Sequence, residues 1–218
     1  KSGYPARSIS TLFFGGGTPS LFSGNQLKAI MDALQENFSF ESDAEVTLEA
    51  NPESTTPGYL EELHSVGINR LSMGVQSFDP SVLKTLERVH RPELVAPLVT
   101  AAKDLGLATS VDLIYGAPKE TMESWKETLG QAIELGTGHV SAYSLIVEPG
   151  TKLARQIKSG ELPETDDDLD ADKHKLADAM LSDAGLSWYE VSNWGEPSRH
   201  NQAYWRSSDW WGYGPGAH

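Results

Sequence analysis

The feature of this chain that most constrains its fold is a regular alternation of short apolar runs with helical patterns. Five runs rich in β-branched and aromatic residues begin roughly 25 to 40 residues apart, which is the length of one strand–helix unit. Such alternation predicts a parallel sheet covered by helices, either doubly wound or curled into a barrel. We favour the barrel. The predicted strands are Ile9–Phe14, Val46–Ala50, Arg70–Val75, Thr109–Tyr115 and Val140–Ile146.

Helical patterns fill the stretches between these runs. The first has apolar residues at positions i, i+3, i+4 and i+7, which form one face of a helix. Glycines follow several others and predict helix ends, because glycine accepts the left-handed backbone that closes a helix. The predicted helices are Asn25–Asn37, Pro57–His64, a helix capped by Asp79, Val95–Leu105, Ser124–Leu135 and Lys173–Ala184.

Glycine-rich or polar turns follow several of the predicted strands. In a parallel barrel the carboxyl ends of all strands face one rim, and binding sites are built at that rim. The first turn, residues 15–20 (GGGTPS), has no lysine of a Walker loop. It is either a tight strand–helix connection or a place where a ligand approaches bare backbone N–H groups.

Charged side chains near the same rim are further candidates. Glu49 ends an apolar strand and Asp112 lies inside one, where a buried carboxylate is costly unless it is paired. Each either forms an ion pair with lysine or arginine or accepts hydrogen bonds from ligand hydroxyls. Arg88 follows a predicted helix, and it either clamps a ligand carboxylate or is a solvated residue at a helix end.

Charge and composition exclude several functions. The 31 acidic and 17 basic side chains give a net charge of −14, which opposes binding along a nucleic-acid backbone. The sequence has no cysteine, so these residues form no disulfide, thiolate nucleophile or cysteine-ligated metal site. It also has no apolar run long enough to span a bilayer and no secretory signal. We expect a cytoplasmic location and a piece of a longer protein.

The strand–helix pattern ends near Gly150. We therefore expect a barrel portion, residues 1–150, followed by residues 151–218, with an acidic loop (Glu164–Asp172), a helix and an aromatic-rich segment. Residues 186–218 hold five of the six tryptophans. This density indicates either an aromatic core or a platform for a flat conjugated ligand. His200 lies in this segment and is either a structural residue or a ligand.

Five short motifs occur in order along nearly the whole chain. They are GGGTPS (15–20), LEANP (48–52), NRLSMGVQSF (69–78), DLIYG (112–116) and EPGT (148–151). Together they resemble the radical-SAM family of oxygen-independent coproporphyrinogen III oxidases. The block from Tyr189 to His218, with the pattern His-Asn-x-x-Tyr-Trp, is similar to the heme-chaperone branch of that family, HemW.

The resemblance implies a partial (βα)6 barrel, its first strand missing here, that holds S-adenosylmethionine against a [4Fe–4S] cluster. In the family the first glycine-rich turn bonds the methionine amino group, and a glutamate after the next strand holds the ribose hydroxyls. The matching cofactor residues are Gly16, Gly17, Thr18 and Glu49, and further positions lining the cofactor and substrate cavity are Gln76, Arg88, Asp112 and Ile146.

The sequence departs from the family at the cluster. The family holds its [4Fe–4S] cluster on an upstream Cys-x-x-x-Cys-x-x-Cys loop, and this sequence has no cysteine. We expect that the loop is missing from the chain as given, with a cluster-free form as the alternative. The chain as given should therefore not reduce S-adenosylmethionine.

The resemblance implies a heme chaperone that binds heme and passes it to an acceptor protein that the sequence does not identify. We predict that His200 is an axial ligand of the heme iron and that Arg199 and Arg206 meet the propionates. One alternative is an oxidase that removes carboxyl groups from a porphyrinogen by a radical mechanism. Another is a cluster-free barrel that serves only for binding or docking.

Overall fold

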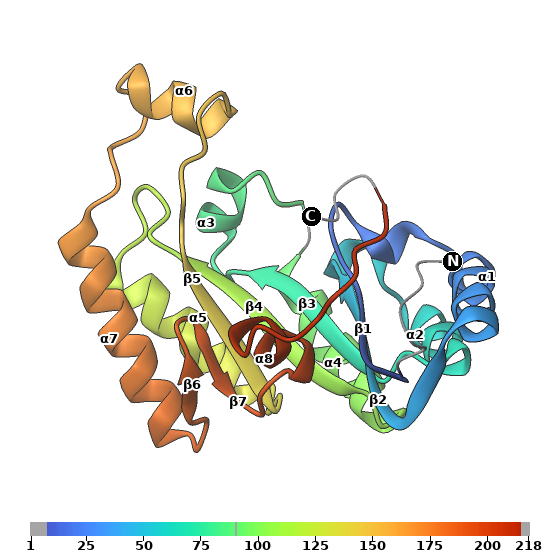
Figure 1. Cartoon of the computed structure of the whole chain (residues 1–218). Coiled ribbons are helices and arrows are strands. Elements are labelled where there is room, and N and C mark those ends of the chain that lie inside the picture. The colour runs from blue at the N-terminus through green and yellow to red at the C-terminus, as the bar shows by residue number, and fades with distance from the viewer. Residues whose placement is uncertain (1–7, 90, 215–218) are drawn as a thin grey trace.

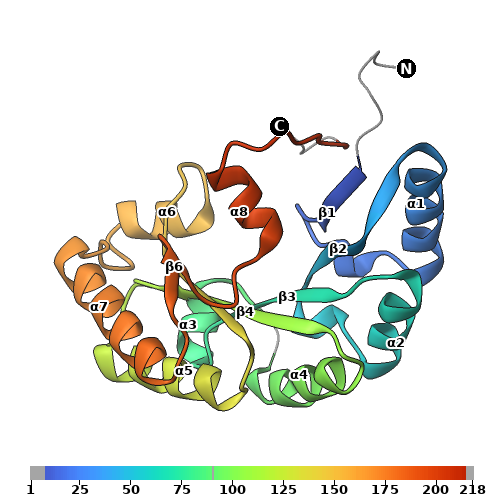
Figure 2. The same cartoon turned by 60° about the horizontal axis from the view of Figure 1, so that its bottom comes forward.

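A single sheet curls into an open half-barrel (Figures 1 and 2). The computed structural model describes residues 8–89 and 91–214. Five neighbouring strands pair in parallel in chain order, and an antiparallel hairpin extends the sheet beyond the fifth. In spatial order the strands are β1 (Ser8–Phe14), β2 (Ser39–Ala50), β3 (Arg70–Gln76), β4 (Ala108–Tyr115), β5 (His139–Ser144), β7 (Asn193–Gly195) and β6 (Trp188–Glu190).

Most of the helices cover the outer face of the sheet, and one helix lies inside its curve. They are α1 (Gly24–Asn37), α2 (Pro57–Val66), α3 (Pro80–Thr85), α4 (Val95–Asp104), α5 (Met122–Glu134), α6 (Lys152–Lys158), α7 (Asp167–Asp183) and α8 (Arg199–Trp205). Short 3-10 turns span Pro19–Leu21, Pro52–Ser54 and Pro92–Leu94. In Figure 2, α1, α2, α4, α5 and α7 form the outer layer, whereas α8 lies on the concave side of the sheet.

The strands separate an apolar outer face from a polar inner face. Successive side chains of a strand point to opposite faces of the sheet. On β2, Val46 and Leu48 are buried in the hydrophobic core beneath the helices, whereas the alternate residues Glu45, Thr47 and Glu49 belong to the other face. The concave side of the half-barrel is therefore lined by side chains that can hydrogen-bond a ligand.

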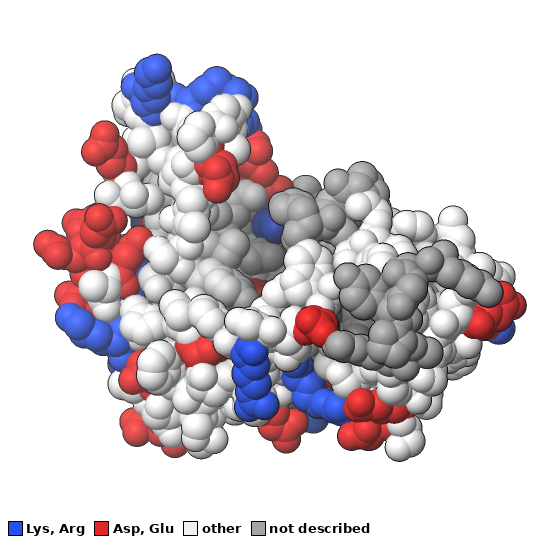
Figure 3. All heavy atoms as spheres, viewed as in Figure 1, with Lys and Arg blue, Asp and Glu red and all other residues white. Residues whose placement is uncertain are grey.

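The predicted barrel strands and the helices between them are confirmed, with changed boundaries. β2 begins at Ser39 rather than Val46, and β5 ends at Ser144 rather than Ile146. The prediction of an acidic loop over Glu164–Asp172 is wrong from Asp167 onward, because α7 begins at that residue. The Asp166 carboxylate accepts hydrogen bonds from the N–H groups of Asp168 and Leu169, and acidic residues in a first helical turn favour a helix N-terminus. Figure 3 shows acidic side chains gathered over α7.

A buried ion pair fastens α7 to the loop after β4. The Lys173 ammonium lies 2.8 Å from the Glu120 carboxylate, and both side chains are almost completely buried. Glu120 also accepts a hydrogen bond from the Gly116 N–H, so the ion pair fixes the loop that follows β4. Burial raises the pKa of Glu120, and the bond from Lys173 opposes that shift. In the parts of the chain that the structure describes, no helix is long and apolar enough to cross a membrane.

Candidate functional site

A cavity of about 190 Å³ lies at the carboxyl ends of the first four strands. In Figure 3 the surface is hollowed beside the projection that carries α6. The cavity is lined by Gly17, Thr18, Pro19, Glu49, Ala50, Asn51, Ser72, Gly74, Gln76, Arg88 and Asp112. The fold thus brings six of the candidates from the sequence together at one rim, although they come from four successive strand–helix units.

The glycine turn after β1 folds onto Glu49. The Gly16 N–H donates a hydrogen bond of 3.0 Å to Glu49 Oε2. Gly16 and Gly17 have φ angles of 78° and 64°, which glycine adopts without strain, and a Cβ at either position would meet no atom within 4 Å. The turn therefore offers open backbone at the edge of the cavity, and Gly16 joins the site through its contact with Glu49.

Two carboxylates share the cavity, and neither forms an ion pair with lysine or arginine within residues 8–89 and 91–214. Burial raises the pKa of Glu49; the Gly16 N–H opposes this shift and the charge of Asp112 adds to it. Burial also raises the pKa of Asp112, whose carboxylate accepts a hydrogen bond of 2.8 Å from Ser72 Oγ. Such carboxylates favour a ligand that brings hydroxyl groups or positive charge.

Gln76 reaches the cavity from a distorted strand end. A bulge breaks the register of β3 with β4 between Gly74 and Gln76, and Gln76 has a φ angle of 65°. Residues other than glycine rarely adopt this backbone conformation. Bulges of this kind redirect side chains beside binding sites. Only the family resemblance predicted that Gln76 lies at this site. A glutamine does not by itself indicate a positive φ angle, so the residue type could not predict this backbone conformation.

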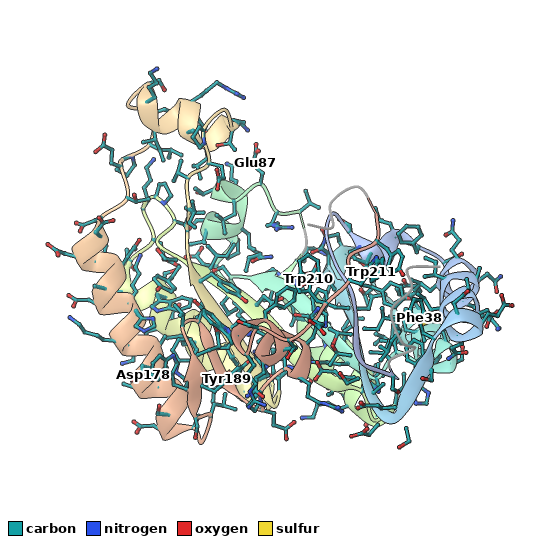
Figure 4. The ribbon with its side chains drawn as sticks, in the orientation of Figure 1. Phe38, Glu87, Asp178, Tyr189, Trp210 and Trp211 are labelled. Carbon is teal, nitrogen blue, oxygen red and sulfur yellow. The ribbon has the colours of Figure 1, made fainter. Side chains whose placement is uncertain are left out.

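Arg88 is the cation of the cavity. It follows Glu87, which has a φ angle of 56° and whose carboxylate lies 2.6 Å from the Lys152 ammonium of α6. Figure 4 shows Glu87 beyond α3 on the side facing α6. No carboxylate in the described residues forms an ion pair with Arg88. The guanidinium thus remains available to an anionic group of a ligand.

Ile146 lies apart from this cavity. Its side chain is 76% exposed, and it is absent from the cavity lining. Its assignment to a cofactor or substrate cavity stays a prediction.

His200 occupies a second place, on the concave side of β1. Its Nδ1 lies 2.8 Å from Thr11 Oγ1, and its ring stacks on Phe13 with ring centres 5.1 Å apart. The Tyr204 ring meets it edge-on at 5.3 Å. Burial lowers the pKa of His200 while the nearby Glu45 charge opposes that shift, so the imidazole is neutral near neutral pH. Among the residues that the structure describes, Nε2 has no hydrogen-bond partner.

The aromatic segment around His200 is divided between the core and the surface, and its expected use as a platform for a flat ligand stays a prediction. Trp194 is fully buried and donates a hydrogen bond to Asp178 of α7, so it belongs to the core. Trp205, Trp210 and Trp211, by contrast, are each at least half exposed. Figure 4 shows Trp210 and Trp211 beside β1, beyond the end of α8.

Arg199 pairs with carboxylates of β2. Its guanidinium lies 3.2 Å from the Asp43 carboxylate and 3.4 Å from the Glu41 carboxylate, and its predicted contact with a propionate stays a prediction. Arg206 is exposed, and it has no ion pair with any described residue.

The sequence missed the residues that hold α8. Glu45 accepts hydrogen bonds from Ser198 Oγ and from the N–H groups of Arg199 and His200. One available signal was the alternation of Glu41, Asp43 and Glu45, which places three carboxylates on one face of a strand.

The parallel strands define a half-barrel of the βα class, with its cavity at their carboxyl ends, where barrels of this class build their sites. The sequence matches the profile of the Radical SAM superfamily over residues 3–132, which is more than half of the chain. The chain belongs to the radical SAM superfamily. That membership implies S-adenosylmethionine and a [4Fe–4S] cluster as the cofactors of the family.

Individual relatives within this superfamily are similar to most of the chain. The chain is 46% identical to the heme chaperone HemW of Mycobacterium tuberculosis over 217 residues, covering 98% of this chain and 56% of that protein. It is 38% identical to HemW of Escherichia coli over 216 residues, again covering 56% of that protein. The solved structure of coproporphyrinogen III oxidase (HemN) from Escherichia coli matches with a TM-score of 0.80 and 32% identity, over 92% of this chain and 46% of that one. The chain thus spans about half the length of these relatives.

The two cofactors of the family fit the chain unequally. The cavity offers carboxylates, a guanidinium and bare N–H groups, which suit the hydroxyls, the carboxylate and the positive charge of S-adenosylmethionine. The cluster does not fit, because the sequence has no cysteine thiolate to ligate its iron. Within the described residues, no group of three or more histidine, aspartate or glutamate side chains is placed to hold a metal ion.

Proposed function

We propose that this chain is the radical-SAM portion of a heme chaperone, which binds heme beside α8 and S-adenosylmethionine in the cavity and passes the heme to an acceptor protein. The observation that carries the proposal is the placement of the His200 ring, held on β1 by Thr11 and Phe13 with Nε2 unpaired among the described residues and with exposed tryptophans nearby. The names of the HemW relatives support the choice of heme as the cargo.

The aromatic side chains suit a flat apolar ligand. Heme combines such a ring with two carboxylates and an iron that accepts a nitrogen ligand. Trp210 and Trp211 supply aromatic faces, His200 supplies the nitrogen, and Arg206 supplies a cation for one propionate.

The cavity suits the nucleoside and amino-acid ends of S-adenosylmethionine. Glu49 would accept hydrogen bonds from the ribose hydroxyls, in exchange for the bond that it now accepts from Gly16. Asp112 and Arg88 would meet charged groups of the ligand. S-adenosylmethionine in this family supplies radical chemistry together with a cluster, and we assign no such step to this chain because it has no thiolates.

Heme titration tests the proposal. The chain and its His200→Ala variant are titrated with heme and followed through the Soret band. We expect the variant to bind at least tenfold more weakly, which is about 1.4 kcal/mol, and to lose the Soret position of histidine-ligated heme. His174→Ala is the matched control, because His174 also touches an aromatic ring, that of Trp194. An unchanged Soret position and affinity in His200→Ala would overturn the assignment.

The second candidate function is that of an oxygen-independent coproporphyrinogen III oxidase. The structural likeness to HemN favours it. Turnover of coproporphyrinogen III would support the oxidase, whereas heme binding without turnover would support the chaperone. Failure to bind any tetrapyrrole would leave a barrel that serves only for docking.

A further inference from the structure

His200 is held by a pair of residues that face each other across two strands. Thr11 of β1 and Glu45 of β2 are direct neighbours in the parallel register. Thr11 bonds the ring of His200 through Nδ1, and Glu45 accepts the backbone N–H of the same residue at 2.9 Å. Both the ring and the backbone of His200 are thus attached to one place on the sheet.

The Glu45 carboxylate is fully engaged by the start of α8. One oxygen accepts from Ser198 Oγ and the His200 N–H, and the other accepts from the Arg199 N–H. A carboxylate in this position satisfies N–H groups that a helix N-terminus leaves unpaired. The arrangement fixes where α8 begins and therefore where His200 stands.

The ring of His200 is then oriented by three contacts. Thr11 holds Nδ1, Phe13 covers one face with an interplanar angle of 19°, and Tyr204 packs edge-on at 72°. If a metal bound at Nδ1, the bond to Thr11 would break, whereas binding at Nε2 leaves that bond intact. Histidines that ligate metals commonly donate their other ring N–H to a neighbouring oxygen, which fixes the tautomer.

We propose that Thr11 and Glu45 form a positioning pair that holds His200 with Nδ1–H directed at Thr11 Oγ1 and presents Nε2 to the heme iron. This inference rests on the proposed function, and it adds the atom of His200 that binds and the residues that select it. Neither Thr11 nor Glu45 touches the ligand; both act through His200.

The test uses variants that remove one interaction each. Thr11→Val keeps the shape of the side chain and removes the hydroxyl, and Thr11→Ser is the matched control that keeps it. Nitrogen-15 NMR of the heme-free chain reports the tautomer of His200. We expect Nδ1–H in the unchanged chain and in Thr11→Ser, and loss of that preference in Thr11→Val.

Heme affinity gives the second readout. Loss of a neighbour that orients a metal ligand commonly weakens binding by about 10- to 100-fold, and we expect Thr11→Val to fall in that range while Thr11→Ser stays within about twofold. Glu45→Gln keeps the size of the side chain and removes the charge that meets three donors, so we expect it to weaken heme binding and to change the NMR signals of α8. Circular dichroism checks that each variant is folded.

The outcomes separate this inference from the proposed function. If His200→Ala leaves the Soret band unchanged, His200 is not the ligand and the proposed function fails at that point. If His200→Ala abolishes histidine ligation but Thr11→Val retains both the tautomer and the affinity of the unchanged chain, the positioning role is overturned. A predominant Nε2–H tautomer in the unchanged chain would also overturn it.

Discussion

The cavity at the strand ends and the place where His200 contacts Thr11, Phe13 and Tyr204, here called the seat, are built in different ways. The cavity gathers residues from four successive strand–helix units, because parallel strands all deliver their carboxyl ends to one rim. The seat forms only when α8 folds back into the half-barrel, so that Thr11 meets a residue 189 positions away in the sequence. The first depends on topology alone, whereas the second depends on one returning segment.

The two places differ in chemistry and yet share a wall. The cavity holds two carboxylates and a guanidinium, whereas the seat holds a neutral imidazole between aromatic rings. One face of the Phe13 ring stacks on His200, and the edge of that ring lies 2.5 Å from where a Cβ of residue 15 would stand. That same Cβ would lie 3.3 Å from the Glu49 carboxyl carbon, so the absence of a side chain at Gly15 lets the two places adjoin.

The largest expected effect is the complete absence of a [4Fe–4S] cluster from the chain. A [4Fe–4S] cluster is held by thiolates, and the sequence has no cysteine, so neither region can hold one. After anaerobic incubation with iron and sulfide, followed by desalting, we expect the chain to stay colourless, with HemN of Escherichia coli as the positive control. A stable brown protein with cluster absorption would contradict this and would reveal ligands other than cysteine.

We expect acid to lower the free energy of unfolding by protonating His139, which contacts β7, the strand before α8. Burial and the Arg70 charge lower the pKa of His139 to about 4. With its proton on Nε2, the neutral ring accepts a hydrogen bond from Arg70 at Nδ1 and donates from Nε2 to Asn193 of β7, which leads to α8. The same Nδ1 also lies 3.0 Å from the Glu196 carbonyl oxygen. The unfolded chain binds the proton more readily than the folded chain. Neutral His139 therefore stabilises the folded chain above about pH 6.5, by on the order of 3 kcal/mol, and this stabilisation is lost as the pH falls toward 4.

Denaturant unfolding at several pH values, in the chain and in His139→Gln, measures this effect. The cavity carboxylates Glu49 and Asp112 have raised pKa values and contribute the opposite slope, but they do so in both proteins. The difference between the two curves therefore isolates His139. We expect that difference to shrink between pH 6.5 and 4, and a difference that does not change with pH would refute the role.

The smallest expected effect concerns the cavity. Hydrogen bonds from ribose hydroxyls to a carboxylate contribute roughly 1.5–3 kcal/mol each at best. Glu49→Ala should therefore weaken S-adenosylmethionine binding by tenfold or more, about 1.4 kcal/mol or above, while the barrel stays folded. Calorimetry measures the affinity, with Glu61→Ala on the exposed face of α2 as the control. Unchanged affinity in folded Glu49→Ala would leave Glu49 with only its bond to Gly16.

The sequence predicts the cavity far better than the seat. Glu49 and Asp112 could be placed at one rim because their strands were readable from local apolar patterns. Glu45 could not, since the first half of β2 is polar and the strand was expected to begin after it. No local pattern shows that this carboxylate would meet the start of α8, whose partners are more than 150 residues away.

The central claim is that one half-barrel binds two ligands at two separate places. The most direct measurement is the affinity of both heme and S-adenosylmethionine in the unchanged chain, in Glu49→Ala and in His200→Ala. We expect Glu49→Ala to lose affinity for S-adenosylmethionine and to keep its affinity for heme, and His200→Ala to show the reverse. If either substitution weakens both ligands to the same extent in a folded protein, the two places are one site and the claim is contradicted.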